Sequence, residues 1–86
     1  MRTERATVCI PQGIHAAIAH RLHREAGRFQ SSLFLKHGAR TASLGSIIAI
    51  LALGVERGAE IEILADGSDE SAALVAIVGL LDELAT

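Results

Sequence analysis

The order of apolar patterns along the chain predicts an α+β fold, in which a four-stranded, largely antiparallel sheet carries three helices on one face. Four short segments alternate apolar and polar residues as strands do, and three segments place apolar residues at helical spacing. The predicted order is βαββαβα, which is too irregular for an array of parallel βαβ units. Because 86 residues suffice for one hydrophobic core, we expect a single domain over residues 1–86.

The composition predicts an aliphatic core and argues against two classes of partner. Half of the residues are hydrophobic, but the chain has only two Phe and neither Trp nor Tyr. The aromatic platforms on which single-stranded nucleic acids stack are therefore nearly absent. A net charge of −2 also provides no general attraction to nucleic acid or to an anionic membrane. A small nucleic-acid-binding α/β module is thus the weaker alternative class.

The start of the chain, its longest apolar run and its single cysteine predict a cytoplasmic protein. Residues 1–5 are charged, and the apolar segment of a signal peptide does not follow them. The apolar run at residues 47–55 is far too short to span a bilayer. One cysteine excludes an internal disulfide, which fits a reducing compartment. Because Cys9 falls in a predicted strand, we expect it to be a small buried hydrophobic residue.

The first predicted strand and helix cover residues 3–27. Residues 3–10 alternate apolar and polar side chains, and the turn residues 11–13 end that strand. Residues 15–27 then form a helix, because apolar residues recur on one stripe and Gly27 is a suitable C-terminal stop. The stripe consists of Ile18, Ala19, Leu22 and Ala26.

A hairpin and a short apolar helix are predicted next. Residues 32–36 and 40–42 form two strands, joined by a turn in which His37 is expected to be solvated. Ser46 is a natural N-cap for a helix over residues 47–53, since its hydroxyl can accept from unpaired first-turn amides. This helix is too apolar to bury every side chain. Helical spacing directs Ile50 and Leu53 inward and leaves Ile47, Ile48 and Leu51 partly outside.

The last strand and helix complete the predicted fold. Residues 60–65 show the clearest strand alternation, and Asp66-Gly67 forms a turn. Either Ser68 or Asp69 is expected to cap the final helix, which ends near Leu84. Its apolar stripe is Leu74, Ile77, Val78, Leu81 and Leu84.

His15 is the main candidate for chemistry. It stands where the predicted helix begins, and the first amides of a helix have no partner within it and lie at the positive end of its dipole. A phosphoryl group on the imidazole would lie against the backbone N–H groups of Ala16, Ala17 and Ile18. A neutral imidazole is also a good nucleophile near pH 7. This placement suits a phosphoryl carrier, although a lone histidine at a helix start is more often a polar surface residue.

Other histidines give weaker signals. His20 and His23 lie three residues apart on the predicted helix, but two ligands make a poor metal site. We therefore expect no metal ion. The sequence also has no phosphate-binding glycine loop or nucleophile motif, so we expect no cofactor.

Two segments of the chain carry recognisable signatures: Gly13-Ile14-His15-Ala16, with Ala19 three residues later, and residues 46–54. The first resembles the active-site signature of the HPr family, the histidine phosphocarriers of the bacterial sugar phosphotransferase system, and the second is similar to the signature around the regulatory serine of that family. Residues 58–63 and 65–70 resemble its last strand, turn and helix start. The resemblance covers essentially the whole chain. It implies an open-faced sandwich of a four-stranded antiparallel sheet and three helices.

The resemblance implies a phosphoryl carrier and not an enzyme. His15 matches the histidine that enzyme I phosphorylates at the expense of phosphoenolpyruvate, and enzyme IIA-type proteins then receive the group. Ser46 matches the serine that an HPr kinase/phosphorylase modifies in many Gram-positive bacteria. Plain N-capping is the alternative role for Ser46.

A docking surface is expected beside His15. An exposed apolar patch often marks an interface, and self-association or core filling are the alternatives. The resemblance implies that partners dock on the short helix, and basic flanks would suit partners with acidic rims. The expected surface consists of Arg21, Arg24, Ile47, Ile48 and Leu51. We expect the protein to be a monomer.

The sequence departs from the family pattern just after His15. The family typically has Arg and Pro where this chain has Ala17 and Ile18, and the missing guanidinium would contact the phosphate or the partner. Two compensations are conceivable: the N–H group of Ile18 adds a donor, or Arg21 reaches back along the helix face. Without compensation, the chain would be a regulatory HPr-like module that uses phosphorylation of Ser46 or His15 only as a switch.

Overall fold

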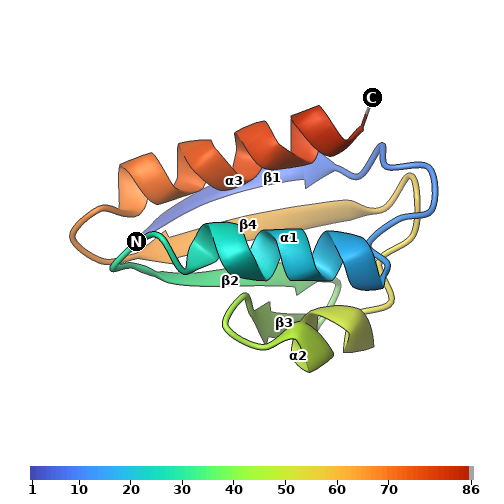
Figure 1. Cartoon of the computed structure of the whole chain (residues 1–86), viewed down its shortest axis with the longest axis horizontal. Coiled ribbons are helices and arrows are strands. Elements are labelled where there is room, and N and C mark those ends of the chain that lie inside the picture. Colours follow the sequence, from blue (N-terminus) through green and yellow to red (C-terminus); the bar gives the residue numbers. More distant parts are fainter. Residues whose placement is uncertain (86) are drawn as a thin grey trace.

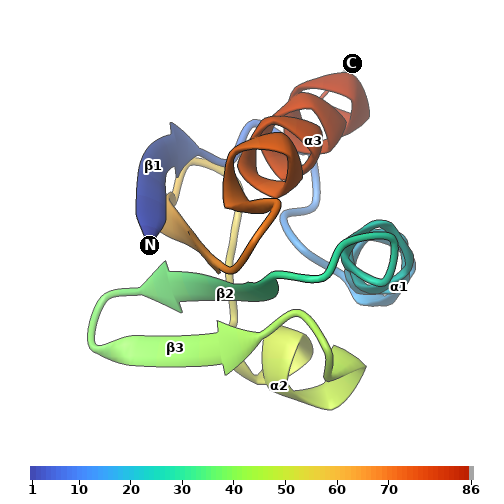
Figure 2. The same ribbon diagram turned by 90° about the vertical axis from the view of Figure 1, so that its left-hand side faces the viewer.

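The computed structural model describes residues 1–85 and contains one sheet with three helices. The strands are all antiparallel and lie in the order β1-β4-β2-β3. The helices lie on one side of this sheet, and its other face is open (Figure 1 and Figure 2). This confirms the predicted α+β fold. In chain order the elements are β1 (Arg2–Thr7), α1 (Ala16–Ala26), β2 (Ser32–His37), β3 (Arg40–Ser43), α2 (Ile47–Ala52), β4 (Glu60–Asp66) and α3 (Glu70–Leu84).

The central strand β4 shows how alternation sorts side chains between the two faces. Ile61, Ile63 and Ala65 are buried beneath the helices, and Glu62 and Leu64 between them are only half-buried. The register pairs Ile63 with Leu35 of β2, and both side chains are completely buried. The core is therefore aliphatic, as the composition predicts.

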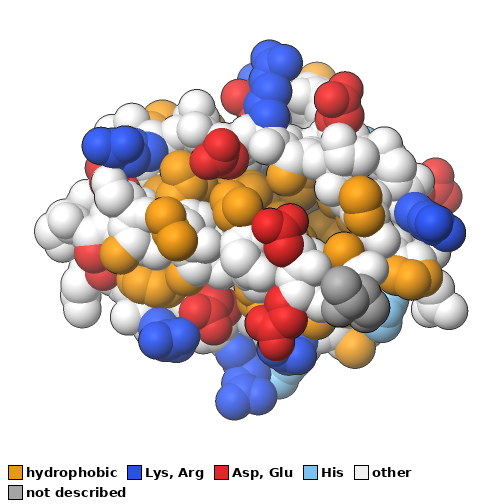
Figure 3. Space-filling model, turned by 90° about the horizontal axis from the view of Figure 1, so that it is seen from above, with side chains coloured by type: hydrophobic (Ala, Val, Ile, Leu, Met, Phe, Trp, Pro, Cys, Tyr) orange, Lys and Arg blue, Asp and Glu red, His pale blue; other side chains and the backbone are white. Residues whose placement is uncertain are grey.

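The helices bury most of the stripes predicted for them. In α3, Leu74, Ile77 and Leu81 are buried as predicted, whereas Val78 and Leu84 are only partly buried and Leu80 is buried as well. In α1, Ile18, Ala19 and Leu22 are buried, and Ala26 packs partly against the core. The final helix α3 is apolar on its outer side as well. Seen from above, over α3 and β1, hydrophobic side chains gather in the middle of the face, with acidic side chains among them and basic ones at the rim (Figure 3). None of the helices within residues 1–85 is long and apolar enough to cross a membrane.

The prediction that Cys9 is buried was wrong. The regular strand β1 ends at Thr7, and Val8 continues the pairing by donating its N–H group to Ala59 O at 2.9 Å. Val8 and Ile10 both point into the core. Cys9 lies between them, so its side chain points to the solvent. The same alternation that identified the strand places Cys9 on the outer face.

The structure also corrects the expectations for His37 and Asp69. His37 is half-buried, and its Nδ1 lies 3.1 Å from Leu53 O, so it is not a solvated turn residue. Asp69 precedes α3 but does not cap it with its side chain. The Asp69 carboxylate instead accepts hydrogen bonds from Ser31 and from the Gln30 amide. Both corrections arise because each side chain meets a segment that is distant in sequence.

Candidate functional site

The turn before α1 holds the candidate histidine in place. Gly13 has a φ of +67°, and a Cβ there would lie only 2.4 Å from Val55 O. Only glycine therefore allows this close approach. The next amide, Ile14 N–H, donates to Val55 O at 3.0 Å, and the Ile14 side chain is buried. The segment around Val55 thus anchors the chain immediately before His15.

His15 is the N-cap of α1. Its backbone is extended, with φ −92° and ψ −176°, and its carbonyl accepts the first helical bond from Ala19 N–H at 2.9 Å. The side chain is exposed and makes no capping hydrogen bond. The imidazole is therefore accessible to a partner protein.

Three backbone N–H groups at the start of α1 have no hydrogen-bond acceptor within the helix. The amides of Ala16, Ala17 and Ile18 precede the first helical bond, so the helix itself cannot satisfy them. The first turn of α1 contains no acidic residue, and the side chains of Ala16 and Ala17 are small and exposed. The positive end of the helix dipole is therefore open to an anion. The structure brings these predicted donors together with His15.

Arginine side chains line the exposed surface of α1. Arg21, Arg24 and Arg28 share a shallow cleft with Glu25. Arg28 forms an ion pair with Glu25 at 2.7 Å. Within residues 1–85, Arg21 and Arg24 form neither an ion pair nor a side-chain hydrogen bond, so their guanidinium groups are available to an acidic partner.

The short helix α2 presents an apolar surface to solvent. Ile48 is 81% exposed and Leu51 is 39% exposed, whereas Ile47 is half-buried. Ile50 and Leu53 are buried, as their helical spacing predicts. At the start of α2, Ser46 Oγ accepts a hydrogen bond from Ala49 N–H at 3.2 Å. This confirms the predicted N-cap and leaves the hydroxyl exposed.

Side-chain donors around α2 were not identified from the sequence. Arg40 donates from Nη1 to Ala52 O at 3.0 Å, and His37 Nδ1 lies 3.1 Å from Leu53 O. His23 Nδ1 lies 3.0 Å from Leu44 O, just before the helix. These contacts join residues 12 to 21 positions apart, so no local pattern indicates them.

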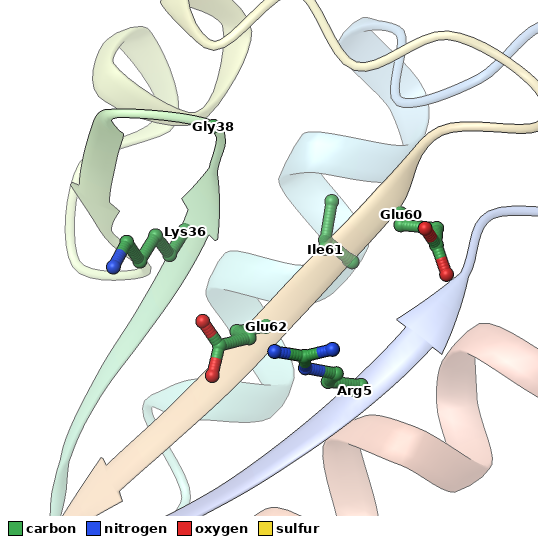
Figure 4. Close-up of a pocket in the computed structure, with 6 residues that line it drawn as sticks. All are labelled: Arg5, Lys36, Gly38, Glu60, Ile61 and Glu62. Atoms are coloured by element: carbon green, nitrogen blue, oxygen red, sulfur yellow. The ribbon is translucent and has the colours of Figure 1, made fainter.

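A pocket on the open sheet face is separate from this site. In Figure 4, side chains of Lys36, Glu62 and Arg5 lie in a row across β2, β4 and β1, on the side away from the helices. The pocket mixes both signs of charge, and His15 does not line it. Within residues 1–85, no group of three or more His, Cys, Asp or Glu side chains is placed to hold a metal ion.

An open-faced βαββαβα sandwich with an exposed histidine at the start of its first helix has the architecture of a histidine phosphocarrier. The family model described as "PTS HPr component phosphorylation site" matches residues 2–83. The phosphocarrier protein HPr of Lysinibacillus sphaericus is 33% identical over 84 residues, which cover 98% of this chain and 96% of that protein.

Solved structures agree with this match. HPr-C-His from Thermoanaerobacter tengcongensis superposes with a TM-score of 0.94 at 27% identity, covering 99% of this chain and 96% of that one. Crh of Bacillus subtilis, described as a swapped dimer, has a TM-score of 0.78 at 29% identity and covers 100% and 99%. The chain therefore belongs to the HPr family, whose members are phosphocarriers of the phosphotransferase system and not catalysts.

Proposed function

We propose that this chain carries a phosphoryl group on His15, received from enzyme I at the expense of phosphoenolpyruvate and delivered to enzyme IIA-type proteins. The observation that carries the proposal is the exposed imidazole directly before three amides that the helix cannot satisfy. Membership of the HPr family supports the choice of partners. The protein acts as a substrate of transferases and needs no cofactor.

The chemistry follows from the start of α1. A neutral nitrogen of His15 attacks phosphorus, so that a P–N bond forms as the bond to the donor's leaving atom breaks. The group brings negative charge to the positive end of the helix, where the amides of Ala16, Ala17 and Ile18 donate to its oxygens. Delivery to the next protein reverses these steps on a new acceptor atom.

Partners are expected to dock beside His15 on both α1 and α2. Apolar side chains of α2 supply a centre that loses water on docking; Ile48 and Leu51 are exposed, and Ile47 is half-buried. Arg21 and Arg24 supply unpaired positive charge on the exposed surface of α1. A partner with an apolar centre and an acidic rim fits this surface.

The absence of Arg at position 17 requires another source of phosphate contact. Arg21 lies one turn after Ala17 on the same helix face, and helical side chains generally lean toward the N-terminus. If Arg21 replaces the missing guanidinium, Arg21→Ala slows transfer. An unchanged transfer rate would remove this compensation.

The backbone of residue 18 offers the second compensation. Ile18 has an N–H group that proline lacks, and it is one of the three amides before the first helical bond. Ile18→Pro should therefore shorten the lifetime of phospho-His15. An equal lifetime in both proteins would show that this amide does not contribute.

A regulatory module is the second candidate function. It is favoured by Ala17 and Ile18, which replace the family's Arg and Pro, and by the exposed hydroxyl of Ser46 at a helix start. In this case an HPr kinase/phosphorylase modifies Ser46, and negative charge beside Ile47 and Ile48 changes partner docking.

Incubation with enzyme I and phosphoenolpyruvate separates the two functions. If the protein is a carrier, it acquires acid-labile phosphate and passes it to an enzyme IIA-type protein. The His15→Ala variant then acquires no such phosphate. The switch acquires only acid-stable phosphate on Ser46, and only from ATP and the kinase. That second pattern would overturn the carrier proposal.

We also propose that residues 1–86 work as one cytoplasmic, monomeric domain that binds neither nucleic acid nor membranes. The net charge of −2 supports this, because it gives no general attraction to polyanions. Light scattering during size-exclusion chromatography tests the monomer. A dimer mass would make the described swapping of Crh relevant to this chain.

A further inference from the structure

The C-terminal end of α2 is held by side chains from the β2–β3 hairpin. A helix of six residues leaves its last carbonyls without helical partners, and it has little stability of its own. Arg40 Nη1 donates to Ala52 O, and His37 Nδ1 contacts Leu53 O at 3.1 Å. A carbonyl oxygen only accepts, so Nδ1 of His37 must carry the proton.

The carbonyl that His37 contacts, Leu53 O, lies two residues before the backbone group that anchors the start of α1. Two residues after Leu53, Val55 O accepts from Ile14 N–H at 3.0 Å, and Ile14 immediately precedes His15. The residue between them, Gly54, has a φ of +62°, and a Cβ at this position would meet no atom within 4 Å. The side chains of Leu53 and Val55 are buried, and Gly54 between them donates its N–H group to Leu51 O at 3.2 Å, so the Leu53 carbonyl belongs to the turn that ends α2.

We propose that His37 is a positioning residue for phosphoryl transfer, because its bond to Leu53 O fixes the backbone that holds Ile14 and thereby the start of α1. The inference rests on the proposed role of His15. His37 does not touch the phosphoryl group. It acts through two hydrogen bonds: His37 binds Leu53 O, and Val55 O, two residues further on, binds Ile14 N–H.

Two variants test the donor while retaining a side chain of similar size. His37→Phe removes the donor, and His37→Asn keeps an N–H group near the place of Nδ1. The first readout is hydrogen exchange of the Ile14 amide, measured by NMR. The second is the rate at which His15 reacts with phosphoramidate, a chemical phosphoryl donor that needs no enzyme I.

His37→Phe should accelerate Ile14 exchange and slow the reaction of His15, each by about fivefold, as expected for the loss of one hydrogen bond. His37→Asn should restore most of both values. His20→Phe is the matched control, because His20 is exposed on α1 and its side chain makes no hydrogen bond within residues 1–85. It should leave Ile14 exchange unchanged.

The outcomes distinguish this inference from the proposed function. The positioning role would be overturned if His37→Phe left the Ile14 exchange rate unchanged. It would also be overturned if the Asn and Phe variants gave the same exchange and reaction rates. If phosphoramidate labels His15 and responds to His37 while enzyme I does not label it, the positioning role stands and the proposed donor is wrong.

Discussion

The proposed chemistry of His15 relies first on backbone groups at the start of α1. Its ring is exposed, and no acidic side chain lies in the first turn of α1. Gly13 is the residue that makes this arrangement possible, because its positive φ brings the chain against Val55. A side chain at position 13 would displace the turn and the imidazole with it.

Asp69 provides a residue-scale prediction of acid sensitivity. The Ser31 hydroxyl, followed by the Gln30 amide, lowers the pKa of Asp69 below its ordinary value of 3.8. A lowered pKa in the folded protein means that the charged carboxylate stabilises the fold. This contribution is complete above about pH 4 and is lost as the pH falls through the lowered pKa.

The Asp69→Asn variant should therefore unfold at lower denaturant concentration at pH 7 and show a weaker loss of stability on acidification. Urea titrations between pH 2 and 7 measure both effects. Asp82→Asn is the control, since the Asp82 side chain is exposed and has no hydrogen bond or ion pair within residues 1–85. Equal pH profiles for the two variants would contradict this role of Asp69.

At the scale of elements, α2 divides its side chains between the core and the proposed docking surface. Ile50 is completely buried, whereas Ile48 is 81% exposed, although they are only two residues apart. Ile50→Ala should destabilise the fold by about 2–5 kcal/mol, as buried large-to-small changes do. Ile48→Ala should change the free energy of unfolding by no more than about 0.5 kcal/mol.

For phosphoryl transfer from enzyme I to folded protein, Ile48→Ala should have a larger effect than Ile50→Ala. Ile48→Ala removes exposed apolar surface from the proposed docking helix, so it should raise the KM for this chain. Urea unfolding and steady-state transfer assays provide the two measurements. An Ile48 variant with normal KM would remove α2 from the docking surface.

Local patterns predicted the elements well because each depends on residues close in sequence. Ser46 caps α2, Ile50 and Leu53 are buried, and the stripe of α1 faces the core as expected. The contacts of His37 with Leu53 and of Asp69 with Ser31 could not be predicted. They form only after the hairpin and the helices are brought together.

At the scale of the whole molecule, charge is uneven although the net charge is small. Arg21 and Arg24 are unpaired on the exposed surface of α1, whereas Arg5 lies on the open sheet face (Figure 4). Salt screens exposed charges, so kcat/KM for transfer from enzyme I should fall as ionic strength rises.

Removing the charges on α1 should flatten that dependence. The double variant Arg21→Ala, Arg24→Ala should lower transfer at low salt and reduce its salt sensitivity, and Arg5→Ala should change neither. Transfer rates measured from low salt to about 0.5 M NaCl test this, where the Debye length falls well below 10 Å. An unchanged salt slope in the double variant would place the docking surface elsewhere.

The central claim is that amides at the start of α1 receive the phosphoryl group carried by His15. The direct measurement compares two-dimensional ¹H–¹⁵N NMR spectra before and after His15 is phosphorylated. The amide protons of Ala16, Ala17 and Ile18 should move downfield as they donate to phosphate oxygens, and more distant helical amides should stay in place. Phosphorylated His15 with these three amide signals unmoved would contradict the account.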